Sequence, residues 1–285
     1  MTAALRKRGL DWLLNAYAGL ALIYLLVPIA VIIVFSFNDP IGRFNFVWEQ
    51  FSLDAWKHPF AVQGVGDALK TSIEIAALST LIATALGTLT ALALVRYEFR
   101  GRSPVNFFIF IPLATPEVVL GAALLSQFLN WGTPQLGFVT ILIAHVMFNL
   151  SFVVITVRSR LIGFDRSLEE AAQDLGATPW ETFRLVTLPL IMPGVAAAAL
   201  LAFALSIDDF VITNFNSGST ITFPLFIWGA ARVAVAPQIY VIATMIFLFT
   251  VAMMILTVWQ QRRADKMAAV RPDDTELAAL EPAPA

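Results

Sequence analysis

Four carboxylates lie in or beside long apolar stretches of this sequence, and they are the residues best placed for chemistry. Asp208 and Asp209 stand side by side in LSIDDFVITNF, Glu117 lies in IPLATPEVVLG, and Glu74 follows the start of another apolar run. An ionisable side chain is expensive to hold among apolar groups, so it is a functional hypothesis by default. Carboxylates in such a setting attract cations and repel anions. The pattern therefore indicates a path for a cationic solute.

Each of these acids also has a structural interpretation, which the sequence leaves open. Asp208 and Asp209 come at the end of an apolar run and could end its helix in water. Glu117 follows two prolines, which should kink or break its helix, and it could cap the amides they leave unpaired. Glu74 could remain at a membrane surface.

The residue content argues against covalent chemistry and metal binding. The chain has no cysteine and two histidines, His58 and His145, which excludes thiolate ligands and leaves little for a metal cluster. A G-x-x-x-x-G-K-[ST] phosphate loop is absent from the sequence. We therefore expect a chain that is not an enzyme. An intramembrane enzyme is the alternative, but neither Ser/His nor paired-Asp spacing across the apolar runs supports it.

Composition places these acids in a membrane protein. Of the 285 residues, 59% are hydrophobic and 13% are charged, whereas a soluble domain is about 25% charged. A transmembrane helix needs about 20 apolar residues, and backbone polar groups in lipid must be satisfied within the helix. We predict an all-α polytopic membrane protein with six transmembrane helices. The expected spans are 12–37, 71–95, 104–129, 136–157, 190–211 and 237–259.

The expected domain organisation follows from these spans. Residues 1–11 form an N-terminal segment and 12–262 the membrane domain. The run 12–37 is too long for the apolar part of a signal peptide, so we expect it to be retained. The remainder, 263–285, is acidic, rich in alanine and contains proline, which predicts a disordered tail.

The basic residues predict the orientation. Fourteen of the 18 Lys and Arg residues fall at the two termini or in the second-to-third and fourth-to-fifth connections. The other side holds Arg43, Lys57, Lys70 and Arg232. Lys and Arg concentrate in cytoplasmic loops. Both termini and the connection 158–189 are therefore expected in the cytoplasm.

That connection is polar and patterned as two short helices. Ser167 and Glu170 fit a capping box, and Gly176 is a natural stop. A second capping box with proline at the first helical position would restart the helix. The apolar face of the first helix is Leu168, Ala171, Ala172 and Leu175. This pattern is typical of a docking surface for another protein. A helix lying on the membrane is the alternative, although such helices usually carry basic residues.

The connection resembles the EAA loop of binding-protein-dependent ABC importer permeases. The family pattern is E-A-A, three residues, G, nine residues, I, one residue, L-P, and only Val186 departs from it. The matching residues are Glu170, Ala171, Ala172, Gly176, Leu188 and Pro189. In that family this segment is the coupling helix, which docks into a groove on a cytoplasmic ATPase.

The resemblance covers about residues 10–262 and implies a type I ABC importer permease fold. The implied partners are a second, different permease subunit, two ATPase subunits and an external substrate-binding protein. ATP and Mg²⁺ would be used by the ATPase, while this chain would bind no cofactor, no metal and no nucleic acid. The implied location is the bacterial inner membrane. The external loop 38–70 is rich in aromatic residues, which predicts an interfacial belt or, equally and compatibly, part of a platform for an external binding protein.

One segment resembles a narrower branch of the family, the second permease subunit of spermidine/putrescine importers. The similar stretches are SIDDFVIT, then Gly218, FPL and ARVAVAP, all within 206–245. Iron, thiamine and other permeases share parts of this segment. The predicted function is therefore polyamine import, with a permease for an iron complex, thiamine or an anion as the alternative. A secondary transporter is a further alternative, but no inverted repeat is visible.

Overall fold

The computed structural model describes residues 2–132, 135–163 and 165–269, and within them every regular element is a helix. Two isolated β-bridges are the exceptions. The chain divides into two compact units, Met1–Val62 with Ala234–Ala285, and Gln63–Val233. The prediction of an all-α protein is confirmed.

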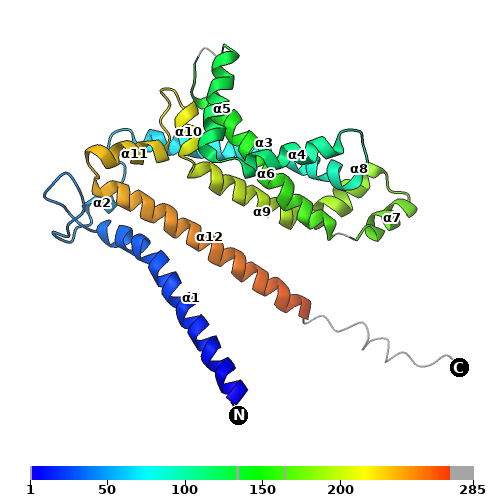
Figure 1. Cartoon of the computed structure of the whole chain (residues 1–285), viewed down its shortest axis with the longest axis horizontal. Coiled ribbons are helices and arrows are strands. Elements are labelled where there is room, and N and C mark those ends of the chain that lie inside the picture. Colours follow the sequence, from blue (N-terminus) through cyan, green and yellow to red (C-terminus); the bar gives the residue numbers. More distant parts are fainter. Residues whose placement is uncertain (1, 133–134, 164, 270–285) are drawn as a thin grey trace. The chain divides into compact units, whose positions relative to one another are not determined.

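The first unit contains α1 (Thr2–Phe35), the short α2 (Asp54–Lys57) and α12 (Pro237–Ala269). Figure 1 shows α1 and α12 meeting at the ends that border the loop between α1 and α2. Both long helices carry many exposed apolar side chains, as a lipid-facing surface requires. The helix α12 continues through Ala269, past residue 262, and the rest of the expected tail, 270–285, lies outside the described residues.

Side-chain amides fasten the loop that follows α1. Asn38, which is buried, donates through Nδ2 to Asn45 Oδ1 (2.6 Å) and to the Val47 carbonyl (2.8 Å), while its Oδ1 accepts the Glu49 amide (2.8 Å). Asn45 donates to the Phe35 carbonyl at the end of α1 (2.8 Å). Each buried amide group is thus paired, and the loop has a fixed path.

Aromatic rings of the same loop pack against one another. Phe37 is stacked between Phe51 and Trp56, with ring centroids 5.8 and 5.2 Å away. Phe44 and Phe46 form a second stack and are exposed. The exposed rings are consistent with either an interfacial belt or a docking platform.

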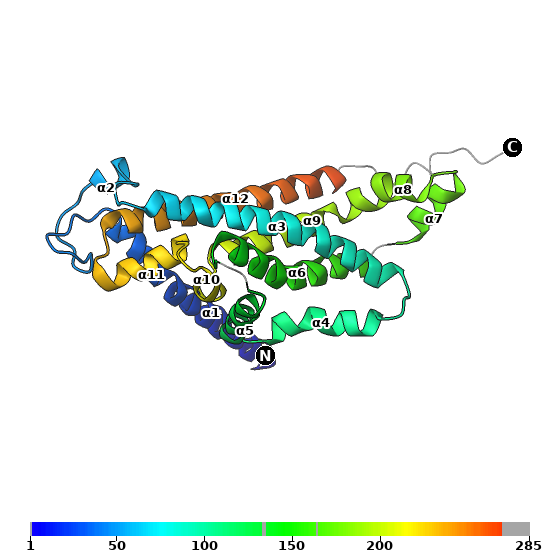
Figure 2. The same ribbon diagram turned by 90° about the horizontal axis from the view of Figure 1, so that it is seen from above.

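The second unit is built around three long helices, α3 (Val65–Arg96), α6 (Phe138–Ile162) and α9 (Leu188–Ile207). Figures 1 and 2 both show these helices side by side. Their shared core is rich in alanine and β-branched residues, including Ala83, Val153, Val154, Ile191 and Ala198. Small residues allow such close approach: a Cβ on Gly87 would lie 2.6 Å from the Val153 side chain.

The third predicted span is broken, as the prolines indicated. The helices α4 (Arg102–Ala114) and α5 (Glu117–Asn130) are bent by 113° at Thr115 and Pro116. Thr115 is extended, with φ −88° and ψ 131°, because the residue before a proline avoids the helical region. Pro112 lies within α4 and does not end it. The break therefore belongs to Pro116 alone.

Short helices occupy the two ends of the second unit. At one end lie α7 (Ser167–Asp174), α8 (Pro179–Thr182) and a π-helix, η1 (Phe183–Thr187), which leads into α9. At the other end, α10 (Val211–Asn216) and α11 (Phe223–Val233) follow α9. In Figure 2 the two groups of short helices lie toward opposite ends of α3.

Length and apolarity identify four candidate spans among the described residues. These are Trp12–Phe35, Val65–Arg96, Phe138–Ile162 and Pro179–Ile207. The bent pair α4 and α5 makes a fifth if it counts as one span. The apolar part of α12, Pro237–Ala252, is shorter than a span by the same measure. The chain is thus a helical membrane protein, with four to five candidate spans in the part that the structure describes.

Candidate functional site

The helix α7 begins one residue earlier than the sequence suggested. Ser167 is its first helical residue rather than its cap, and the predicted Ser167–Glu170 capping box is wrong. Asp165 Oδ1 instead accepts the Ser167 amide at 3.0 Å. An Asp side chain commonly bonds the backbone two residues on, and here this turn competes successfully with the serine cap.

The turn after α7 follows the predicted chemistry. Gly176 has φ +91°, the left-handed conformation that glycine adopts most easily. The Gly176 and Ala177 amides donate to carbonyls of the last turn of α7, at 2.9 and 3.0 Å. Thr178 and Glu181 form a reciprocal capping box, with Pro179 at the start of α8. The prediction of a helix, a glycine stop and a capped restart is confirmed.

The apolar face of α7 is turned to the outside. Leu175 is 89% exposed and Leu168 is 48% exposed, and Trp180 and Leu185 are exposed beside them. A cavity of about 420 Å³ lies next to these side chains, lined by residues of α7, the turn after it, α8 and η1 that include Ala172, Gly176 and Val186. Large exposed apolar side chains that are grouped around a hollow are typical of an interaction surface.

Some of the predicted coupling residues lie on this exposed surface, and the others lie where the segment joins α9. Glu170 and Ala171 are exposed, while Ala172 and Gly176 line the cavity. Leu188 packs against the core of α3, α6 and α9, and Pro189 opens α9. The motif therefore runs from an exposed surface to the first turn of a core helix.

The buried residue of α7 is an acid that sequence reasoning missed. Glu169 is 8% exposed, and its carboxylate accepts hydrogen bonds from the Arg96 guanidinium and the Thr187 hydroxyl. Arg96 ends α3, and Thr187 ends η1. No local pattern indicates these pairings, because the three residues are far apart in the sequence.

Asp208 and Asp209 occupy the break between α9 and α10, and they differ in environment. Asp208 is exposed, whereas the side chain of Asp209 is 6% exposed. Asp209 Oδ2 accepts the Thr213 amide and hydroxyl, each at 2.7 Å, and so caps α10. The Asp209 carboxylate is thus used in hydrogen bonds within the fold, whereas Asp208 places its carboxylate at the surface of this chain.

A buried histidine supports Asp209. His145 Nε2 lies 2.9 Å from Thr213 Oγ1 and 3.3 Å from Asp209 Oδ2, and Nδ1 lies 2.6 Å from Ser206 Oγ. Because the Thr213 hydroxyl donates to Asp209, Nε2 must carry the proton it shares with Thr213. Ser206 Oγ is in turn 3.0 Å from Ser79 Oγ on α3. The network joins α3, α6, α9 and α10.

The two other predicted pathway acids lie on the surface of this chain. Glu117 is the first residue of α5 and is exposed. The helices α5 and α10 pack together where Asn216 Nδ2 donates to the Gly121 carbonyl (3.4 Å). Glu74 is also exposed and lies 3.9 Å from Lys70 on α3. Among the described residues, no hydrogen bond or ion pair joins Glu74 to the other acids.

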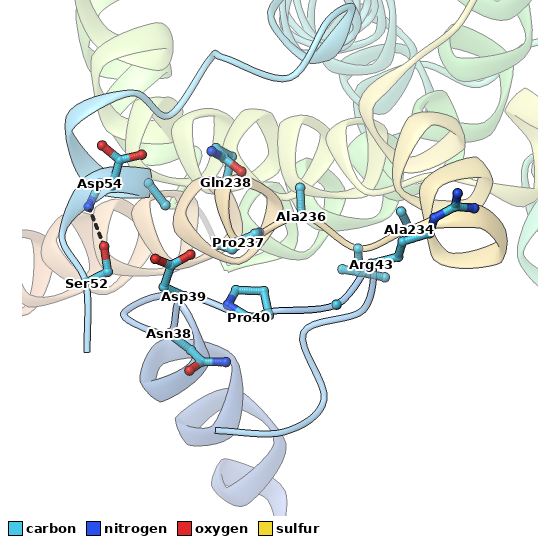
Figure 3. A pocket seen from close by; sticks show the side chains of 13 residues that line it. Asn38, Asp39, Pro40, Arg43, Ser52, Asp54, Ala234, Ala236, Pro237 and Gln238 are labelled. Atoms are coloured by element: carbon cyan, nitrogen blue, oxygen red, sulfur yellow. Dashed lines mark hydrogen bonds between the residues drawn. The ribbon is translucent and has the colours of Figure 1, made fainter. Parts of the chain in front are cut away.

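The first unit carries a separate pocket of about 230 Å³ between the loop after α1 and the start of α12. Figure 3 shows Asp39 and Asp54 toward one end of this pocket and Arg43 toward the other. Both acids are exposed. The pocket belongs to the aromatic loop predicted to be external.

Comparison with known proteins agrees with this architecture. The family described as "Binding-protein-dependent transport system inner membrane component" matches residues 83–266. The spermidine/putrescine transport system permease protein PotC of Escherichia coli is 40% identical over 233 residues, covering 81% of this chain and 87% of the relative. The putrescine transport system permease protein PotI of Escherichia coli is 38% identical over 231 residues, covering 78% and 81%.

A solved structure shares the fold. It is a bacterial ABC transporter involved in the import of the acidic polysaccharide alginate, with a TM-score of 0.63 and 18% identity, covering 95% of this chain and 99% of that one. The family match spans more than half of this chain, and PotC resembles it over most of both sequences. The chain with the exposed helical turn at Gly176 and the broken third span therefore belongs to the binding-protein-dependent transport system inner membrane components.

Proposed function

We propose that this chain is one permease subunit of an ATP-driven importer for polyamines of the spermidine and putrescine type. The observation that carries the proposal is its similarity to two permeases named for polyamine transport, at 38–40% identity over most of each chain. The surface charge agrees with a cationic substrate. Asp208 and Glu117 present carboxylates, which would repel an anion.

The chain is a non-catalytic transmembrane component. Its family takes its name from the dependence on a binding protein, which implies an external binding protein and an ATPase as partners. We assign the ATP and Mg²⁺ chemistry to two ATPase subunits, and half of the pathway to a second, different permease subunit. The exposed face of α7 with its cavity supports this assignment, because it offers an ATPase an apolar surface outside the spans.

The loop after α1 is the proposed contact for the binding protein. Its backbone is fixed by Asn38 and Asn45, so it can present Phe44 and Phe46 in a defined position. The pocket beside it offers Asp39 and Asp54 to a basic side chain. A preorganised surface of this kind lowers the entropy cost of docking.

The proposed topology has six spans with both termini in the cytoplasm, α12 being the sixth. It rests on the uneven distribution of basic residues and predicts the result of a reporter experiment. A reporter that works only in the cytoplasm should be active when fused after Ala285, and an alkaline-phosphatase-type reporter, which works only outside, should be inactive there. A fusion in the loop near Gly42 should give the reverse pattern. The opposite result at Ala285 would place α7 outside the cell, where it could not meet an ATPase.

Purification and uptake together test the function. A tag on this chain should recover an ATPase and a second permease from detergent-solubilised membranes. Uptake of labelled spermidine should depend on the chain and fall at least fivefold with excess unlabelled putrescine. Equal excesses of thiamine, a ferric complex or sulfate should leave it unchanged. Inhibition by one of these competitors instead would move the importer to that substrate class, and absence of an ATPase would contradict the importer assignment.

A further inference from the structure

Glu169 is the point where three segments of the second unit meet. It lies in α7, between the exposed Leu168 and the exposed Glu170, yet it is itself 8% exposed. Its carboxylate accepts from Arg96 at the end of α3 and from Thr187 at the end of η1. The other side chains of α7 face outward or line the cavity. Glu169 points inward and holds α7 to the membrane domain.

The buried Glu169 carboxylate is sensitive to the loss of either of its partners. A buried carboxylate is stable only when it is paired and its lone pairs are bonded, and removing one partner leaves an uncompensated charge. The Arg96 side chain is 21% exposed and the Glu169 side chain 10% exposed, so water can replace little of the lost interaction. Thr187 is fully buried. The three groups must therefore move together or exchange partners.

The two partners of Glu169 belong to the helices that form the core. Arg96 closes α3, which packs along α6 and α9. Thr187 directly precedes α9, whose opposite end carries Asp208 and Asp209. The intervening η1 is a π-helix, a rare element that is frequent at functional sites. A displacement of α7 would therefore act directly on both α3 and α9.

We propose that the Arg96–Glu169–Thr187 cluster is the joint through which α7 moves α3 and α9 when a partner pushes or pulls on it. This inference rests on the proposed coupling function and extends it to residues outside the EAA-type motif. Glu169 is in this role a positioning residue. It converts a displacement of the docking face into a displacement of the core helices.

A joint and a simple stabilising contact predict different measurements. If the cluster only stabilises the fold, breaking it lowers the amount of assembled complex, and the remaining complexes transport with normal efficiency. If it is a joint, complexes that do assemble hydrolyse ATP without moving the core helices. The ratio of ATP hydrolysed to substrate transported separates these cases, because the amount of complex cancels from it.

The experiment uses the complete complex reconstituted in lipid vesicles, with spermidine as the transported probe. Glu169→Gln and Arg96→Gln should each raise the ATP hydrolysed per spermidine transported at least fivefold. The double variant should show no larger ratio than the stronger single variant, because both changes break the same Arg96–Glu169 contact. Thr187→Val, which removes one hydroxyl at constant shape, should raise the ratio about twofold. Asp174→Asn changes an exposed acid of the same helix and serves as the matched control.

Two results would overturn the joint. One is a normal ratio in the variants, with hydrolysis and transport falling together or the complex failing to assemble. The other is a double variant whose ratio is the product of the single effects, which would make the two residues independent. Failure of the proposed function looks different, since the wild-type chain would then recover no ATPase or would transport no spermidine.

Discussion

Replacing Gly176 by valine is expected to lower polyamine uptake at least tenfold while the chain still inserts into the membrane. Gly176 has φ +91°, where a β-branched residue is a strong outlier. The strain of such a residue is about 1–3 kcal/mol, and each 1.4 kcal/mol is about tenfold in a population. A Cβ at this position would meet no atom within 4 Å, so the effect comes from the backbone and not from a clash.

Two further variants separate the effect of backbone strain at Gly176 from the effect of adding a side chain. Asparagine tolerates the left-handed conformation, so Gly176→Asn should retain most of the uptake. Gly163 lies in the same connection with φ −85°, and a Cβ there would make an ordinary 3.9 Å contact, so Gly163→Ala should be near normal. Uptake and the recovery of ATPase with the tagged chain are measured for each variant. Normal uptake in Gly176→Val would remove α7 and its turn from the docking surface.

The turn at Gly176 could be predicted because its chemistry is local. The glycine stop, Pro179 and the Thr178–Glu181 capping box all act within a few residues, so their spacing in the sequence is enough. The break at Pro116 was predictable for the same reason, since a proline restricts the residue before it. Even here two local signals competed, and Asp165 displaced the expected serine cap of α7.

The long-range pairings could not be predicted. Arg96 and Glu169 are 73 positions apart, and the His145 and Thr213 pair is separated by 68. Periodicity placed Leu168 and Leu175 on one face of a helix, but it could not say whether that face turns inward or outward. In a soluble protein an apolar face would be buried. In α7 the apolar face is exposed and the acid Glu169 is buried, which is the arrangement expected if the apolar face docks onto a partner.

Hydropathy also misplaced helix ends. The second span was expected to begin at residue 71, but α3 begins at Val65, because Asp67 and Lys70 are tolerated in a helix that extends beyond the apolar core. The fifth was expected to reach residue 211, but α9 ends at Ile207, where Asp209 caps the next helix. Apolar runs report contact with lipid, whereas helix ends are set by caps.

The environments of Asp208 and Asp209 predict different outcomes for the same chemical change. Asp208 is exposed on this chain and free to meet a cation, so Asp208→Asn should lower polyamine uptake about tenfold to a hundredfold with normal assembly. The reason is the loss of a carboxylate–ammonium contact that contributes about 1.5–3 kcal/mol in a partly dry path. Asp208→Glu keeps the charge and should recover most of the uptake. Glu117→Gln should give a loss of the same kind at an exposed position.

Asp209→Asn should instead lower the amount of intact complex. Its carboxylate caps α10 through Thr213 and neighbours His145, so an amide in its place keeps only one accepting oxygen, loses the charge beside His145 and turns an NH2 donor toward the Ile212 amide, which Oδ1 now accepts. An unsatisfied buried group costs about 1–3 kcal/mol, a large fraction of the stability of a typical domain. Thr213→Val breaks the same network from the other side and should give the same loss of complex.

Labelled spermidine uptake must be measured beside the quantity of assembled complex, so that transport is expressed per complex. Asp208→Asn should then fall steeply, while Asp209→Asn and Thr213→Val should stay within about threefold of the wild type. An equal loss per complex in Asp208→Asn and Asp209→Asn would mean that the buried acid also meets the substrate, through a rearrangement that frees it from His145. Full uptake per complex in Asp208→Asn and Glu117→Gln would show that the cation does not depend on these carboxylates, and the path would then have to run along other groups of the two permease subunits.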